Sequence, residues 1–270
     1  MRIASSSLPS RSCTMTPSGP RKSSCIGTFT SRRSARRWRN EAPMKWLIVT
    51  ADDFGITSGI NRGIIQAHRE GILTSTSLMV DRPACEQAAA LGRACGTLSV
   101  GLHLELDPGK PERIHEEIER QLGRFFQLAG ARPTHVDSHH DVHYDPRVLP
   151  HVLAWSERIG APVRGYSRAR HFSKFYGQWG GEAHLEQVGV ESLLRMFDRE
   201  VRDGVTELTC HPGYVEPGFP SSYATEREEE LRTLCDDRVH QAVLEKEICL
   251  IGFRDLSALA TGISVAEGAR

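Results

Sequence analysis

From Lys45 onward, short apolar runs alternate with longer stretches in which apolar residues recur every three or four positions. The short runs predict buried strands, and the longer period predicts amphipathic helices. The predicted strands are residues 46–50, 75–80, 98–104, 134–138, 162–165, 207–209 and 248–251. The predicted helices are residues 58–71, 84–94, 112–128, 147–159, 190–201, 225–235 and 238–246, with a polar, aromatic loop at 166–188.

About seven repeats of strand and helix indicate an α/β fold with parallel strands, either a (β/α) barrel or a doubly wound sheet. The first strand is not followed by Gly-x-Gly-x-x-Gly, and the chain has no Walker loop. A dinucleotide-binding domain is therefore disfavoured.

Residues 1–44 differ in composition from the rest of the chain, with nine Lys or Arg, one acid and few large aliphatic residues. Such a segment buries too little apolar surface to offset its ordering entropy, so we predict a disordered extension. Translation from Met44, a targeting segment and a basic interaction arm are three explanations of it. One domain is expected over residues 45–260, with a flexible tail at 261–270.

The remaining body holds 25 basic and 33 acidic residues, a net charge of −8. General nucleic-acid binding relies on basic surface, so this balance argues against it. No apolar run approaches the ~18–20 residues that span a bilayer. Seven cysteines without C-x-x-C spacing suggest neither a disulfide framework nor a zinc ribbon, and we expect a reduced, cytoplasmic protein.

Acidic and histidine side chains collect where the predicted strands end. Asp52 and Asp53 follow the first predicted strand, and His103 lies at the end of the third. Four histidines lie within residues 135–143, at the end of the fourth strand and just after it, and His211 follows the sixth strand. Catalytic groups of β/α barrels lie at the carboxyl ends of strands. These strands therefore deliver Asp and His to one rim.

One carboxylate and two imidazoles form a plausible open metal site, which leaves positions for water and substrate. A metal there would lower the pKa of water toward ~7, and a second carboxylate could accept the proton. Asp52 and Asp53 offer one residue for each task. The alternatives are a helix cap with a loop acid for this pair, hydrogen-bonded core histidines, and a helical stripe of His135, His139 and His143.

A set of segments in a fixed order carries a resemblance to a known family: residues 47–55, 71–80, 100–103, 134–140, 175–177, 210–212 and 251–255. On these segments the chain resembles the YdjC-like carbohydrate deacetylases, the group that includes chito-oligosaccharide deacetylases and a hopanoid-biosynthesis branch. Asp141 interrupts the run of histidines that is frequent in that family, and the segment between His103 and His135 looks short.

The resemblance implies an irregular (β/α) barrel related to polysaccharide deacetylases, and a hydrolase that removes the acetyl group from an N-acetylated sugar. It implies that Asp53, His103 and His139 hold one divalent metal, that Asp52 is the general base, and that His211 is the acid. Magnesium is the metal often associated with the family, whereas two imidazoles and a carboxylate suit zinc or another transition metal better.

The aromatic loop supplies the remaining candidates for substrate binding. Phe175 and Tyr176, together with Phe172 and Trp179 of the same loop, could stack on sugar rings, or the loop could form a small hydrophobic cluster instead. His143 is a further candidate. The expected partner is the sugar, and a homodimer is considered because exposed patches on such barrels often mediate dimers. A hydrolase of another amide or ester and a non-catalytic carbohydrate-binding protein are the competing functions.

Overall fold

The computed structural model describes residues 44–219 and 221–260. The expectations for residues 1–43 and 261–270 lie outside this part of the chain. The main sheet of the protein has seven strands. Six of them follow the order β4-β3-β2-β1-β8-β5, and β9 also pairs with β1. Every pairing in this sheet is parallel. These strands are β1 (Lys45–Phe54), β2 (Ser75–Leu78), β3 (Ser99–Leu104), β4 (Val136–Ser138), β5 (Arg170–Phe172), β8 (Gly204–Cys210) and β9 (Ile248–Leu250).

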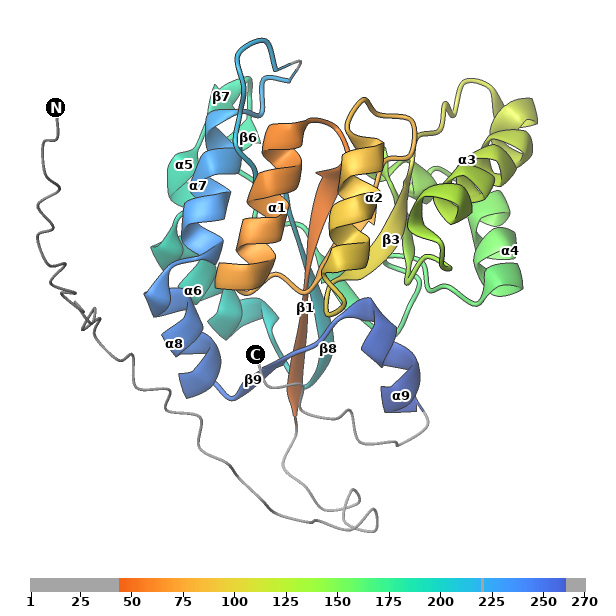
Figure 1. The fold of residues 1–270 in the computed structure, drawn as a ribbon. Coiled ribbons are helices and arrows are strands. Elements are labelled where there is room, and N and C mark those ends of the chain that lie inside the picture. Colours follow the sequence, from red (N-terminus) through yellow and green to blue (C-terminus); the bar gives the residue numbers. More distant parts are fainter. Residues whose placement is uncertain (1–43, 220, 261–270) are drawn as a thin grey trace, which may run out of the picture.

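The sheet curls into an irregular barrel, which confirms the predicted fold class. One stretch of chain connects the two edges of the sheet. Val163 bridges to Val136 on β4, and β5, a few residues later, pairs with β8. Helices cover the outside, with α1 on β1, α2 on β2 and α3 on β3 (Figure 1). The α-helices are α1 (Ser58–Glu70), α2 (Cys85–Ala94), α3 (Ile114–Ala129), α4 (Leu149–Ile159), α5 (Leu185–Val188), α6 (Val190–Glu200), α7 (Thr225–Leu234), α8 (Asp237–Glu245) and α9 (Leu256–Ala260).

Short 3₁₀ segments cover Pro111–Arg113 (η1), His139–Tyr144 (η2) and Phe253–Asp255 (η3). Two expectations were wrong. The loop predicted at 166–188 contains β5, the small hairpin β6 (Gln178–Trp179) and β7 (Glu182–Ala183), and α5. The strand predicted at 162–165 is reduced to the single bridge at Val163. Segments of two to four residues are too short to show a hydrophobic period, so only tertiary pairing reveals them.

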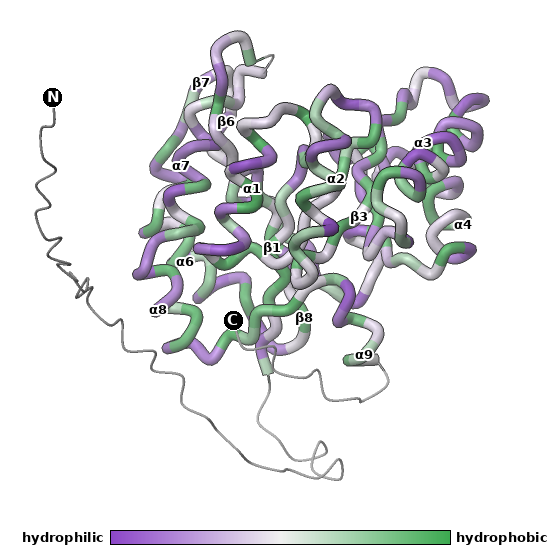
Figure 2. Tube along the Cα trace, in the orientation of Figure 1, coloured by the Kyte–Doolittle hydropathy of each residue, from purple (hydrophilic) through white to green (hydrophobic). Residues whose placement is uncertain are grey.

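Side chains of β1 alternate between two environments, as the period of two in a strand requires. Leu47 and Val49 belong to the main core between sheet and helices. Ile48 belongs to a smaller cluster with Val205 and Phe253, which fills the barrel at the end where β1 begins. Figure 2 shows the result as apolar strands inside a layer of helices that are polar on their outer faces.

Candidate active site

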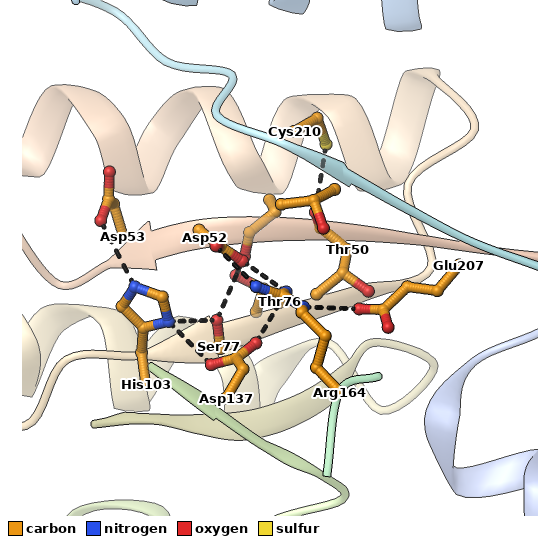
Figure 3. A network of polar contacts seen from close by, with 12 residues as sticks. Thr50, Asp52, Asp53, Thr76, Ser77, His103, Asp137, Arg164, Glu207 and Cys210 are labelled. Carbon is orange, nitrogen blue, oxygen red and sulfur yellow. Dashed lines mark hydrogen bonds and ion pairs between the residues drawn. The ribbon is translucent and has the colours of Figure 1, made fainter. Parts of the chain in front are cut away.

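The inward-facing positions of the strands change from apolar to polar toward their carboxyl ends. On β1 the series runs from Ile48 through Thr50 to Asp52, all fully or almost fully buried. The neighbouring strands bring polar groups to the same level (Figure 3). We call these residues the strand-end cluster: Asp52, Asp53, Ser77, His103, Asp137, Arg164 and Glu207.

Asp53 reaches the site because β1 is irregular at its end. The register between β1 and β2 shifts between Ala51 and Phe54, and Asp53 has a φ of 68°. In a regular strand, adjacent side chains point to opposite faces. The irregularity turns Asp53 toward the histidines while Asp52 keeps its inward position, so that both carboxylates face one site.

Asp53, His103 and His139 place one ligand atom each within 4.8 Å of one another. Asp53 Oδ1 lies 3.7 Å from His103 Nε2 and 3.2 Å from His139 Nδ1. This oxygen is buried and has no hydrogen-bond partner. An unsatisfied buried carboxylate oxygen facing two imidazoles is the donor set of an open divalent-metal site.

His103 is oriented from behind by its second ring nitrogen. Nδ1 contacts Asp137 Oδ1 at 2.7 Å and Ser77 Oγ at 3.1 Å, which leaves Nε2 for the metal side. A carboxylate behind a ligating imidazole is the usual arrangement in metal sites. Burial lowers the pKa of His103, but the nearby carboxylates of Asp137, Asp52 and Asp53 outweigh it and raise the pKa to about 9. The site therefore favours positive charge at this position.

A second group of possible ligands, Asp52, His103 and Asp137, shares that histidine. Its two carboxylates are already engaged by Arg164, which donates to both oxygens of Asp52 at 2.8 and 2.7 Å and lies 2.7 Å from Asp137 Oδ2. The residues that fit a metal are therefore Asp53, His103 and His139.

Arg164 is a residue of the strand-end cluster that the sequence did not single out. It is fully buried, and besides Asp52 and Asp137 it contacts Glu207 through Nε at 3.0 Å. Burial opposes ionisation of Asp52, but Arg164 is the main cause that holds the pKa of Asp52 below its usual range. A basic residue within a short apolar run, as in Val163-Arg164, was the available signal.

His211 follows β8, and its side chain is mostly buried. Its backbone N–H donates to Glu230 on α7, and its Nδ1 lies 4.0 Å from the same carboxyl group. Burial lowers the pKa of His211 to about 4 and raises the pKa of Glu230 to about 8. At this pKa the His211 imidazole is neutral at pH 7. An exposed histidine, by contrast, changes its charge close to neutral pH.

Arg227 on α7 is a second residue of the site that the sequence did not single out. It is buried, and it donates to Asp53 Oδ2, on the side away from the histidines. Its other N–H groups donate to the carbonyls of Tyr223 and His211. Despite burial, Arg227 holds the pKa of Asp53 well below its usual range, and it leaves Oδ1 free.

The residues between His139 and Tyr144 do not form the helical stripe that the sequence left open. They form a kinked 3₁₀ segment in which His140 and Asp141 have φ of 55° and 53°. His139 thereby faces Asp53. His143 is buried, and its Nδ1 contacts Ser138 Oγ at 2.7 Å.

The aromatic candidates Phe175 and Tyr176 differ in exposure. Phe175 is 1% exposed and belongs to the hydrophobic core. Tyr176 is 40% exposed, lies flat on Tyr223 at 4.6 Å between ring centroids, and meets His211 edge-on at 6.0 Å. Tyr176 is thus the one of this pair with ring surface open beside the site.

Among the described residues, no helix combines the length and the apolar character needed to cross a membrane. A protein-family model described as "YdjC-like protein" matches residues 46–113 and 107–245. A carbohydrate deacetylase from Brevibacillus brevis is 35% identical over 246 residues, covering 78% of this chain and 99% of that relative. A chitooligosaccharide deacetylase from Serratia marcescens is 32% identical over 253 residues, with the same two shares covered.

One solved structure, from Enterococcus faecalis V583, is named as a proposed cellobiose-phosphate cleavage protein. It superposes with a TM-score of 0.70 at 26% identity, over 79% of this chain and 99% of that chain.

Proposed function

Since this chain belongs to the YdjC-like protein family, we propose that it is a metal-dependent deacetylase that releases acetate from an N-acetylated sugar or short oligosaccharide. The observation that carries the proposal is the convergence of Asp53, His103 and His139 beside Asp52. The curated relatives named as carbohydrate deacetylases match along nearly their whole length. The proposed residues thus stand within a scaffold already associated with this reaction class.

Asp53, His103 and His139 would hold a divalent cation, which would supply Lewis acidity toward an amide carbonyl and would lower the pKa of water. Magnesium is the expectation from the family, and zinc suits two imidazoles and one carboxylate better. Both metals belong in the first experiment. The buried, unpartnered Asp53 Oδ1 supports occupancy by either one.

Asp52 is the proposed general base. Its lowered pKa keeps it ionised at neutral pH, and the two contacts with Arg164 fix its plane. A positioned carboxylate of this kind can take a proton from water that attacks the acetamide carbon.

His211 is the proposed acid on the side of the leaving amine. Because its pKa lies at about 4, it is neutral before the reaction. To act as the acid it has to receive the proton that Asp52 takes from the attacking water and then donate it to the leaving amine. Its ring edge faces Tyr176, which is the proposed contact for the sugar that carries the acetyl group. His143, although buried, ends in an Nε2 with no hydrogen-bond partner, so it stays a proposed substrate contact.

The test is acetate release from N-acetylglucosamine and its short β-1,4 oligomers by protein stripped of metal and then reconstituted with magnesium or zinc. We expect release that requires metal and disappears in Asp53→Ala. Ser58→Ala, which removes a partly buried hydroxyl bonded to Glu216, is a matched control that should retain activity. Absence of release with metal bound would contradict the proposal.

Another amide or ester on the same scaffold is the competing substrate. The panel therefore includes acetylated sugars with ester linkages, and a phosphorylated disaccharide because the Enterococcus faecalis relative is named for one. Faster turnover of an ester would redirect the assignment, and tight sugar binding without any acetate release would favour a binding protein.

A further inference from the structure

A small aromatic hairpin stands beside the site and is not used by the proposed chemistry. β6 and β7 pair through Gln178 with Ala183 and Trp179 with Glu182, and the turn between them is Gly180-Gly181. Both glycines have positive φ, 63° and 83°. A Gly-Gly turn with two positive φ values is suited to a tight two-residue hairpin, so the position of Trp179 is well defined.

Trp179 presents one covered and one open face. Its indole lies on the His184 ring at 3.6 Å between centroids, with 1° between the planes. Even so, 49% of Trp179 is exposed, the largest exposed fraction of any aromatic side chain in the described residues. Because His184 stacks on one face, the opposite face is the one on which a further ring could pack.

The hairpin is bonded to the residues that lead into α7, the helix whose Arg227 and Glu230 contact Asp53 and His211. Gly177 N donates to Tyr223 Oη at 3.0 Å, and Gln178 exchanges hydrogen bonds with Ser222 at 3.2 and 3.3 Å. Four residues beyond Tyr223, Arg227 holds Asp53. In Figure 1 the hairpin lies at the end of the barrel toward which β1 points.

Two exposed aromatic side chains, Tyr176 and Trp179, lie on one short segment beside the acid residue. Tyr176 meets His211 at 6.0 Å. Trp179 follows three residues later, within about 10 Å along an extended chain. Aromatic rings with one supported face and one free face pack well on the C–H surface of a sugar ring. The spacing suits a substrate with more than one sugar ring.

We propose that the free face of Trp179 is a second sugar-binding position, for a ring of a linear oligosaccharide beyond the ring that loses its acetyl group. This inference rests on the proposed deacetylation and names its substrate class as an oligomer rather than a monosaccharide. The simpler alternative, that Trp179 and His184 stabilise only the hairpin, predicts effects on folding that do not depend on substrate length.

The experiment compares Trp179→Ala and Trp179→Phe with the unchanged protein, using N-acetylglucosamine and its β-1,4 trimer. We expect kcat/KM for the trimer to fall about 3- to 10-fold in Trp179→Ala through KM, with partial rescue in Trp179→Phe. Activity on the monosaccharide should stay unchanged. Tyr214→Ala, another exposed aromatic, is the matched control, and thermal unfolding checks the fold of each variant.

Binding is measured separately by tryptophan fluorescence during titration with the trimer. A shift that is present in the unchanged protein and absent in Trp179→Phe supports the second position, even if no acetate is released. Acetate release that falls equally for both sugars, or not at all, in Trp179→Ala would overturn the second position and leave the deacetylation intact. Trimer binding with no change in emission would also overturn it.

Discussion

The strand-end cluster and the hairpin differ in how their positions are determined. Arg164 in the cluster is fully buried and contacts three carboxyl groups, whereas Trp179 on the hairpin is half exposed and contacts one ring. The cluster is fixed by the register of parallel strands, and the hairpin by a glycine turn and hydrogen bonds to residues 222–226. Our proposals therefore place the reaction chemistry at the strand ends and the choice of substrate on an attached segment.

Arg164→Met should have the largest effect, because it leaves Asp52, Asp137 and Glu207 buried without their cation. Removal of one member of a buried ion pair costs about 3–5 kcal/mol in the free energy of unfolding. Denaturant unfolding measures it. Arg62→Met, which breaks an exposed pair with Glu216, is the control and should change stability by less than about 1 kcal/mol. Equal effects of the two substitutions would remove the distinction between the cluster and the surface.

Asp52→Asn should lower kcat by roughly 10²–10⁴ while metal content is retained, because the amide keeps the shape but cannot accept the proton. Acetate release and metal analysis of the purified variant measure the two quantities. Asp81→Asn, at a partly exposed pair with Arg120, serves as the control. Turnover near that of the unchanged protein would exclude Asp52 as the base.

Glu207→Gln should change how stability depends on pH. Burial raises the pKa of Glu207 to about 7 from an ordinary value of 4.5. The folded state therefore holds a proton that the unfolded chain releases, and this stabilisation is complete below pH 4.5 and lost as the pH rises through about 7. The contribution is about 3 kcal/mol.

Glutamine keeps an acceptor for Arg164 and removes the titration. Unfolding free energies at several pH values between 4.5 and 8 should fall more steeply in the unchanged protein than in Glu207→Gln. Glu186→Gln changes an exposed acid after the hairpin and should keep the original slope. Parallel curves for Glu207→Gln and the unchanged protein would contradict the prediction.

Arg227→Gln tests the connection between the two regions and should have the smallest effect. Loss of a group that orients a metal ligand typically weakens metal affinity about 10–100-fold. Titration of the stripped protein with zinc against a competing chelator measures it. The control is Arg232→Gln, on the same helix but exposed. Unchanged affinity would mean that β1 alone orients Asp53.

Much of the fold followed from the sequence, because buried strands and amphipathic helices leave a strong hydrophobic period. The expected helix at 190–201 matches α6, and the strand at 98–104 matches β3 within a residue. Strand ends also predicted that Asp and His side chains gather at one edge, since parallel strands bring their carboxyl ends together. The family resemblance selected Asp53, His103 and His139 among them, and the structure brings these three together. The hairpin and β5 were missed because they are too short to show a period.

What the sequence alone determined is a parallel α/β fold and a set of polar residues at its strand ends, because both depend on local period and strand direction. The choice of a barrel over a doubly wound sheet came from the family resemblance. The tertiary structure decided which groups support these polar residues. Arg164 and Arg227 meet Asp52 and Asp53 from 112 and 174 residues away along the chain. Such contacts have no local pattern, since they arise only when the sheet curls and α7 packs beside it.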